Sequence, residues 1–243
     1  EVFIVDMYER FRQYITSAKT ATTPFPVDKY MNKALGGQTP EEIKRNLDKG
    51  YQSLVGGLLW AARHSKPESQ LGVNMLCSVM ACPSDLAFEY GLHALKWMYQ
   101  TRTEGITARS DSNPEPISFV DSGWRPSSID GKSTYGFVVF LFGLPIVWTS
   151  KLQPRVAVST AHAEYMALAL CARETIWLRQ LMMELGFKLS APTPLYGDNS
   201  TAIGHCEEDF VSAKSKFTFL PYQQVKAQNN VTIKAEWTPT KIN

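Results

Sequence analysis

The order of local patterns after residue 116 is the feature that most restricts the fold of this chain. A short β-type run, PISFVDSGW (116–124), precedes two β-type runs joined at FGLP (133–151), which together predict a hairpin. A helical pattern follows at 159–186, then a strand leading into a helix at 193–206, and finally an alternating run at 231–239. Strands and helices in this order are typical of an α/β domain. We therefore predict a mixed sheet flanked by helices.

The first hundred residues have a different pattern, because their apolar residues recur every three to four positions. Such spacing predicts amphipathic helices, one of them over residues 4–16. Thr39, followed by proline and two glutamates, is typical of a helix start. The polar stretch 102–115 contains glycine and proline and separates the two patterns. We predict a mostly helical segment over residues 1–110 and an α/β domain over 111–243.

Composition and charge exclude several classes of protein. The 243 residues include 25 basic and 23 acidic residues, so a strongly basic nucleic-acid-binding protein is excluded but a local basic patch is not. With 44% hydrophobic residues the chain can bury a core. Four cysteines without a CxxC pair predict buried free thiols and a reducing compartment. The sequence has neither a signal-peptide pattern nor an apolar run of about 18 residues, so we expect a soluble, intracellular protein.

Three carboxylates stand out by their positions in the predicted elements. Asp121 and Asp198 each end a predicted strand, and Glu164 lies in the first turns of the long helix, for which Thr160 is the expected N-cap and Gly186 the end signal. Acids from separate elements that meet at the carboxyl ends of strands suit a hard cation such as Mg²⁺. Spacing alone leaves the alternative open, because acids at these positions are also common turn, cap and helix-dipole residues.

Four ordered segments carry a resemblance to a known family: FVDSGW, GKSTYGFVVFLFGLPIVWTSK, VAVSTAHAEYMALALCARETIWLRQLMMELGF and PLYGDNSTAI. They resemble the ribonuclease H domain of Ty1/copia-type LTR-retrotransposon polyproteins, where the pattern runs Asp-x-Asp-Trp, Lys-Ser-Thr-Ser-Gly, Ser-Ser-x-Glu-Ala-Glu-Tyr and Asp-Asn-x-Ser-Ala. Upstream, YQSLVGGLLWAARHSKP and LHALKWMYQTRTEGI resemble the segment that joins reverse transcriptase to ribonuclease H, and MYERF resembles the end of the polymerase thumb. The resemblance covers approximately residues 4–240.

The resemblance implies a fold, an activity and partners. The fold is a ribonuclease H-like mixed five-stranded sheet flanked by helices, after a reverse-transcriptase thumb/connection-like segment. The activity is hydrolysis of the RNA strand of an RNA–DNA hybrid, dependent on Mg²⁺ with Mn²⁺ as substitute, with Asp121, Glu164 and Asp198 as catalytic metal ligands. The partners are the hybrid, the rest of a polyprotein and a larger, particle-associated assembly in the cytoplasm. Residues 1–110 contain no Tyr-x-Asp-Asp motif, so no polymerase activity is predicted.

Three departures separate the chain from the family pattern. The family carries a fourth Asp after the segment matched by EWTPTKIN, and this sequence stops at Asn243, so we expect a truncated domain cut from a longer polyprotein. Phe217 and Phe219 stand where the family's Lys-His-Ile-Asp stretch has His and Asp, and Gly123 replaces the second Asp of the first motif. A site with one carboxylate fewer holds its second ion less well. The alternative is a catalytically decayed fold that serves as a structural or binding subunit of a larger assembly.

Polar and basic residues around these motifs are candidates for contact with a nucleic-acid backbone. Such side chains position a duplex through its phosphates. The alternative is an ordinary solvated surface, which also applies to a small cluster formed by Lys214 and Lys216. The candidates flank the predicted strands and the second helix of the α/β domain: Lys132, Ser133, Thr134, Lys151, Arg155, Asn199 and Ser200.

A few further residues have two interpretations each. His162 lies two positions before the helix glutamate and does not share its face, so a helix-surface position is favoured over substrate contact. His205 and Cys206 diverge on a helix, which disfavours a metal pair. Trp124 and Trp148 occur in apolar strand contexts, so core packing is favoured over stacking on bases.

Overall fold

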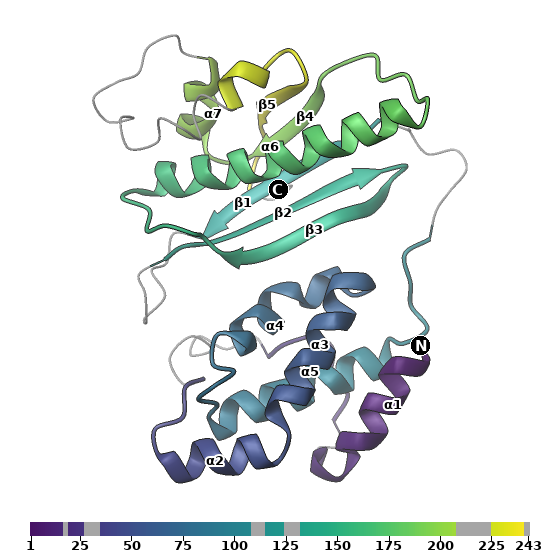
Figure 1. Ribbon diagram of the computed structural model, residues 1–243, viewed down its shortest axis with the longest axis vertical. Coiled ribbons are helices and arrows are strands. Elements are labelled where there is room, and N and C mark those ends of the chain that lie inside the picture. Colours follow the sequence, from purple (N-terminus) through teal and green to yellow (C-terminus); the bar gives the residue numbers. More distant parts are fainter. Residues whose placement is uncertain (17–18, 27–34, 108–114, 124–131, 208–224, 241–243) are drawn as a thin grey trace. The chain divides into compact units, whose positions relative to one another are not determined.

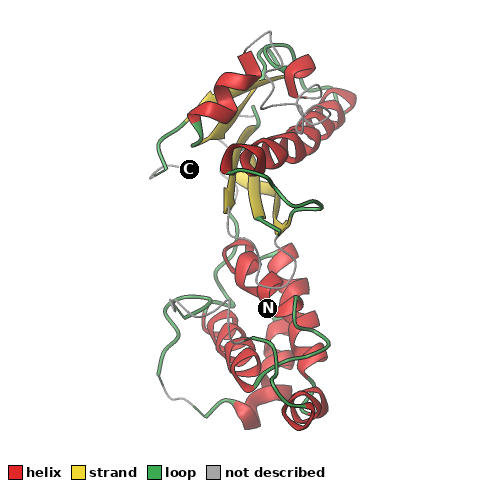
Figure 2. Cartoon of the chain, turned by 90° about the vertical axis from the view of Figure 1, so that its left-hand side faces the viewer, coloured by secondary structure: helices red, strands yellow, loops and turns green. Residues whose placement is uncertain are grey.

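The chain folds into two compact units, Glu1–Ile106 and Thr107–Asn243, in the computed structural model. The described part of the first unit is helical, whereas the second combines strands with helices (Figure 1, Figure 2). The predicted boundary between residues 110 and 111 lies outside the described residues. The structure describes six stretches: residues 1–16, 19–26, 35–107, 115–123, 132–207 and 225–240.

The second α-helix of the first unit begins after Thr39, as the sequence predicts. The Thr39 hydroxyl accepts a hydrogen bond from the Glu42 N–H at 3.2 Å, and proline occupies the first helical position. The pattern at 4–16 is one α-helix followed by a single 3₁₀ turn. The elements are α1 (Val2–Phe11), η1 (Arg12–Tyr14), α2 (Pro40–Asp48), α3 (Tyr51–His64), η2 (Pro67–Ser69), α4 (Gln70–Cys77) and α5 (Asp85–Gln100).

Helix α3 forms the centre of the first unit's core. Its Tyr51, Leu54 and Leu58 are fully buried together with Leu76 of α4 and Leu95 of α5. The Tyr51 hydroxyl donates to the Leu76 carbonyl oxygen at 2.9 Å, so its one polar group is satisfied inside the core. Each large apolar side chain buried in this way contributes about 1.5–3 kcal/mol.

A mixed five-stranded sheet, as predicted, forms the centre of the second unit. The strand order is β3-β2-β1-β4-β5. Neighbours β1, β2 and β3 pair antiparallel, whereas β4 pairs parallel with both β1 and β5. The strands are β1 (Ile117–Gly123), β2 (Thr134–Leu141), β3 (Leu144–Leu152), β4 (Thr193–Gly197) and β5 (Ile233–Trp237).

The hairpin predicted at FGLP joins β2 to β3 through a two-residue turn. Phe142 and Gly143 both have positive φ, 53° and 71°. Positive φ at both central positions gives a turn whose twist matches that of the flanking strands. Phe142 accepts this uncommon backbone conformation while its ring packs edge-on against Phe187, with centroids 5.9 Å apart.

Helix α6 (Thr160–Glu184) lies along one face of the sheet and packs on β1, β2 and β4 (Figure 1). Alternate strand residues such as Val120, Val139 and Leu195 point into this layer and meet Leu168 and Met182 of α6. A shorter helix, α7 (Ser200–Glu207), follows β4. This layering sets the start of α6 near the carboxyl ends of the parallel strands.

Several sequence predictions are corrected or confirmed in detail. Ser159, rather than Thr160, caps α6, because its hydroxyl accepts the His162 N–H at 3.1 Å. Gly186 ends the helix with φ of +89°, as predicted. All four cysteines are free, but Cys82 is exposed and Cys77 is half-buried, so the expectation of buried thiols is confirmed only for Cys171 and Cys206. No helix in the described part of the chain is long and apolar enough to cross a membrane.

Candidate functional site

The structure brings Asp121, Glu164 and Asp198 together. One carboxylate oxygen of each lies within 4.8 Å of those of the other two. The strand register explains half of this arrangement: β1 and β4 run parallel with Phe119 opposite Tyr196, so Asp121 and Asp198, each two residues further on, meet at one edge of the sheet. Glu164 reaches the same place from the start of α6.

A buried glutamine fixes the first turn of α6 to the sheet. Gln153, which is 1% exposed, follows β3, and its Nε2 donates to the Ala163 carbonyl oxygen at 2.7 Å. Its backbone N–H donates to the Ser133 carbonyl oxygen, also at 2.7 Å. Because Ala163 precedes Glu164, these bonds help to set where the glutamate emerges. Sequence reasoning missed Gln153, since an isolated polar residue after a strand is normally solvated.

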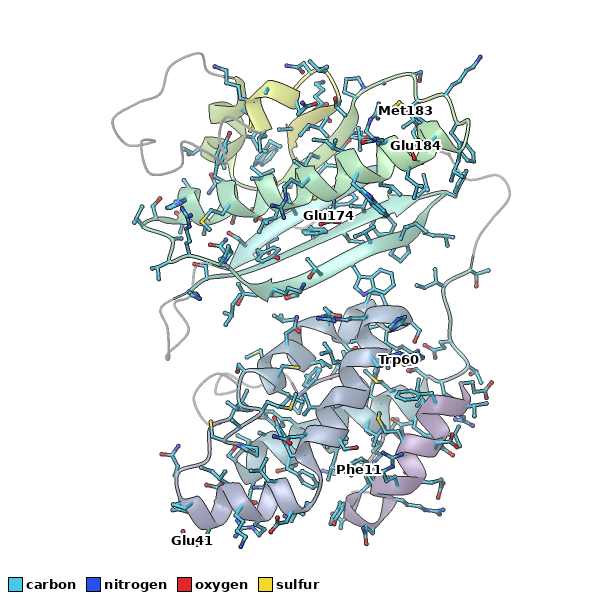
Figure 3. All side chains as sticks on the ribbon, viewed as in Figure 1. Phe11, Glu41, Trp60, Glu174, Met183 and Glu184 are labelled. Atoms are coloured by element: carbon cyan, nitrogen blue, oxygen red, sulfur yellow. The ribbon has the colours of Figure 1, made fainter. Side chains whose placement is uncertain are left out.

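Burial and mutual repulsion make it unfavourable for all three carboxyl groups of this cluster to be ionised at once. Glu164 is 8% exposed, and burial, with further contributions from Asp121 and Asp198, raises its pKa to about 7 although Ser122 partly offsets the rise. Asp121 has more accessible surface, yet partial desolvation and then Asp198 also raise its pKa. Glu174, ten residues further along α6 (Figure 3), lies outside the group.

The donor set matches a hard divalent cation. All three groups offer carboxylate oxygens, which Mg²⁺ and Mn²⁺ prefer, and they come from three separate elements around one point. A cation would also offset the repulsion that raises the pKa of Glu164. The residues present therefore fit a divalent metal. In the described residues this is the one group of three or more such side chains.

Asp198 has neighbours that the sequence reasoning missed. The Trp237 indole Nε1 donates to the Asp198 carbonyl oxygen at 3.0 Å, and the Thr240 hydroxyl donates to Asp198 Oδ2 at 2.8 Å. Next to it, Asn199 caps α7 by accepting the Ala202 N–H at 2.9 Å. The available signal was the Trp-Thr-Pro-Thr run that begins at the last residue of β5, because parallel pairing of that strand with β4 brings the two strand ends together.

The predicted nucleic-acid contacts differ in accessibility. Lys151, Arg155 and Ser200 are exposed, whereas Ser133 is 1% exposed and cannot meet a phosphate in this arrangement. Burial of Ser133 follows from its place opposite Gln153 at the open end of the hairpin, where β2 begins and β3 ends. The remaining candidates, half-buried or engaged in the α7 cap, stay predictions: Lys132, Thr134 and Asn199.

Three of the residues with open interpretations are now placed. His162 is half-buried at the start of α6, where its Nδ1 accepts the Val158 N–H at 3.2 Å and burial lowers its pKa. Cys206 is buried, and its thiol donates to the Ala202 carbonyl oxygen at 3.5 Å. Trp148 is half-buried. Outside the residues whose side chains are described lie Trp124, His205, Lys214, Lys216, Phe217 and Phe219.

Comparison with curated proteins finds relatives among transposon polyproteins. The chain is 28% identical over 217 residues to the retrovirus-related Pol polyprotein from transposon RE2 of Arabidopsis thaliana, a match that covers 89% of this chain and 14% of that polyprotein. It is 26% identical over 226 residues to the corresponding polyprotein from transposon RE1 of the same plant, covering 93% of this chain and 15% of the polyprotein. The chain thus spans only a small part of the relatives' length.

Comparison with solved structures finds ribonuclease H domains at low identity. The N-terminal RNase H domain of a Mycobacterium tuberculosis protein, solved as a fusion with maltose-binding protein, is 16% identical, with a TM-score of 0.40 over 54% of this chain and 86% of that one. No protein-family model matches the chain.

The resemblance seen in the sequence motifs is confirmed by the polyprotein relatives: over 89–93% of its length the chain is homologous to one segment of the retrovirus-related Pol polyproteins of copia-like transposons.

Proposed function

We propose that the second unit is a ribonuclease H-type nuclease that hydrolyses the RNA strand of an RNA–DNA hybrid. The observation that carries the proposal is the convergence of Asp121, Glu164 and Asp198, whose carboxylate oxygens lie within 4.8 Å of one another. The polyprotein relatives support it, because they match this chain along nearly its whole length.

The three acids would hold the divalent metal, which is Mg²⁺ in this proposal, with Mn²⁺ as a substitute. When bound, a pair of such cations supplies an activated water and stabilises the leaving oxygen of a phosphodiester. The protein's own contribution is to fix the three carboxylates on two strand ends and one helix, so that little rearrangement is needed when the substrate binds. Glu164 is also buried away from water, where the effective dielectric is lower and its interaction with a cation is stronger.

Exposed basic residues would position the hybrid by contacts with its phosphates. Lys151 lies near the end of β3, and Arg155 lies on the stretch that leads from β3 into α6, which carries Glu164. The net charge of +2 for the whole chain provides little long-range attraction. Binding of the hybrid by this chain alone is therefore expected to be weak and sensitive to salt.

The polyprotein relatives also suggest the setting in which the chain works. We propose that residues 1–110 serve as a thumb/connection segment of a reverse transcriptase whose polymerase aspartates belong to another part of the polyprotein. The corresponding location is a particle-associated assembly in the cytoplasm. Co-sedimentation of the chain with particles formed by the parent polyprotein is a direct test of this location.

Cleavage of a labelled hybrid tests the nuclease proposal. The full chain is incubated with a 5′-labelled RNA–DNA hybrid in Mg²⁺ or Mn²⁺, and Asp198→Asn is expected to reduce cleavage to the background. The matched control is Glu174→Gln, which removes a carboxylate from the same helix as Glu164 but outside the cluster and should keep wild-type activity.

Equal cleavage by the wild type and Asp198→Asn would refute the nuclease assignment. A folded wild type that binds Mn²⁺ through these acids but cleaves nothing would favour the alternative, a structural or binding subunit.

A further inference from the structure

We infer that Thr240 and Trp237 are positioning residues for Asp198, so that the end of β5 and the segment that follows it set the geometry of the metal site. The inference rests on the proposed function for its role, but its geometry stands by itself. Neither residue is a metal ligand in this proposal. They act on the nucleic-acid substrate only through the carboxylate that they hold.

Parallel pairing brings this segment to Asp198. Gly197, the last residue of β4, lies opposite Trp237, the last residue of β5. The ladder continues by one bond, because the Thr238 N–H donates to the Gly197 carbonyl oxygen at 2.9 Å. The chain after β5 therefore runs beside the loop that carries Asp198.

Two hydrogen bonds then hold Asp198 at different atoms. Trp237 Nε1 donates to its backbone carbonyl oxygen at 3.0 Å, and the Thr240 hydroxyl donates to its Oδ2 at 2.8 Å. The first bond fixes the backbone of a residue that lies outside any strand or helix. The second bond limits rotation of the Asp198 carboxylate about its side-chain bonds. Because Oδ2 is held by Thr240, the direction of Oδ1 is restricted as well.

The composition of the segment suits this task. Pro239 fixes its own φ and favours an extended conformation for Thr238 before it, so little entropy is lost when Thr240 reaches Asp198. A hydroxyl donor satisfies one oxygen of the carboxylate without neutralising its charge, as an arginine or lysine would, so the negative charge remains available to a cation. Trp237 is 54% exposed although its N–H is bonded, an unusual position for a large ring that serves only the core.

Mn²⁺ titration of the full chain tests the role of Thr240. Thr240→Val keeps the shape and removes the hydroxyl, and we expect about tenfold weaker Mn²⁺ binding, since partners that orient a ligand typically change metal affinity by roughly 10–100-fold. Thr240→Ser restores the hydroxyl and should bind like the wild type. The matched control is Thr232→Val, which removes a hydroxyl that donates to Gln228 at 2.7 Å away from the acidic cluster.

A measurement without metal separates this inference from the proposed function. In the metal-free chain, Thr240→Val should lower the thermal midpoint of the second unit by about 2–4 °C in the wild-type background but not in Asp198→Ala, because the bond is then already lost. Indole N–H exchange should be slower for Trp237 than for Trp177, which is similarly exposed at 56%.

The outcomes point to different conclusions. Equal midpoint shifts in both backgrounds, together with unprotected Trp237 exchange, would overturn the inference. Wild-type Mn²⁺ affinity in Thr240→Val would also overturn it. Absence of Mn²⁺ binding by the wild type would instead overturn the proposed function, while the metal-free measurements would still decide whether Asp198 is held in this way.

Discussion

Replacing Glu164 by glutamine should stabilise the metal-free chain while abolishing its stabilisation by metal. The pKa of Glu164 is raised from 4.5 to about 7, so the folded state holds this proton more tightly than the unfolded state does. A raised carboxyl pKa means that the free energy of unfolding falls as pH rises from about 4.5 to about 7 and stays constant above that range. Glutamine has the same shape and no proton to lose, so this part of the pH dependence should disappear.

The size of the effect follows from the two pKa values of Glu164. Their separation, from 4.5 to about 7, corresponds to at most about 3 kcal/mol in the free energy of unfolding. At pH 8 without metal, Glu164→Gln should therefore unfold up to roughly 5–10 °C above the wild type, and near pH 4 the two should coincide. Desolvation of Asp121 acts in the same direction and is unchanged in the variant.

Metal should reverse this order. The wild type gains about 4.1 kcal/mol when free metal is 1,000 times its dissociation constant, which exceeds the variant's metal-free advantage of at most about 3 kcal/mol, whereas the variant has lost one of three ligands and gains less. The assay is thermal and urea unfolding at pH 4, 6 and 8, with EDTA or with Mn²⁺. Glu174→Gln is the control and should follow the wild type throughout, because Glu174 lies outside the cluster. Identical pH profiles for the wild type and Glu164→Gln in EDTA would refute the reasoning.

Two further predictions concern proton release and the independence of the units. Because Mn²⁺ binding requires Glu164 to lose its proton, the apparent affinity should rise by up to about tenfold per pH unit below 7 and level off above it, and calorimetry in buffers of different ionisation enthalpy should detect the released proton. A pH-independent affinity would contradict this. Lys66→Met should destabilise the first unit by about 1–3 kcal/mol, because the buried Lys66 Nζ donates to the carbonyl oxygens of Thr101 at 2.6 Å and Glu104 at 3.1 Å. Hybrid cleavage at a temperature where both units are folded should not change, and a loss of activity there would show that the units are coupled.

Local patterns were sufficient to predict the elements of the second unit and to single out the three acids, whose assignment as metal ligands came from the family resemblance. Burial follows directly from the alternation of apolar residues in β1 and β2 and from the long apolar face of α6. Each acid lies at or near the end or the start of a predicted strand or helix. Their meeting point follows from one general rule, that parallel strands end at the same edge of a sheet. No knowledge of side-chain contacts was needed for that step.

Contacts between distant segments could not be predicted in the same way. Ser133 looked like an exposed turn residue, but pairing with the backbone of Gln153 buries it. The bond from Thr240 to Asp198 joins residues 42 positions apart and depends on the register of β5 against β4. Hydroxyl and amide groups carry no periodic signal, so their partners appear only when the sheet is assembled.

The acidic site therefore depends on the whole sheet rather than on any one motif. Asp121 meets Asp198 only when β4 pairs with β1, and Asp198 is held only when β5 pairs with β4. Both pairings are parallel and bridge long sequence separations, so they are costly in loop-closure entropy. Repulsion among the acids opposes the same assembly, as the raised pKa of Glu164 indicates. A bound cation would reduce that repulsion at the point where β1, β4 and α6 meet, so metal binding and completion of the sheet are expected to be thermodynamically linked.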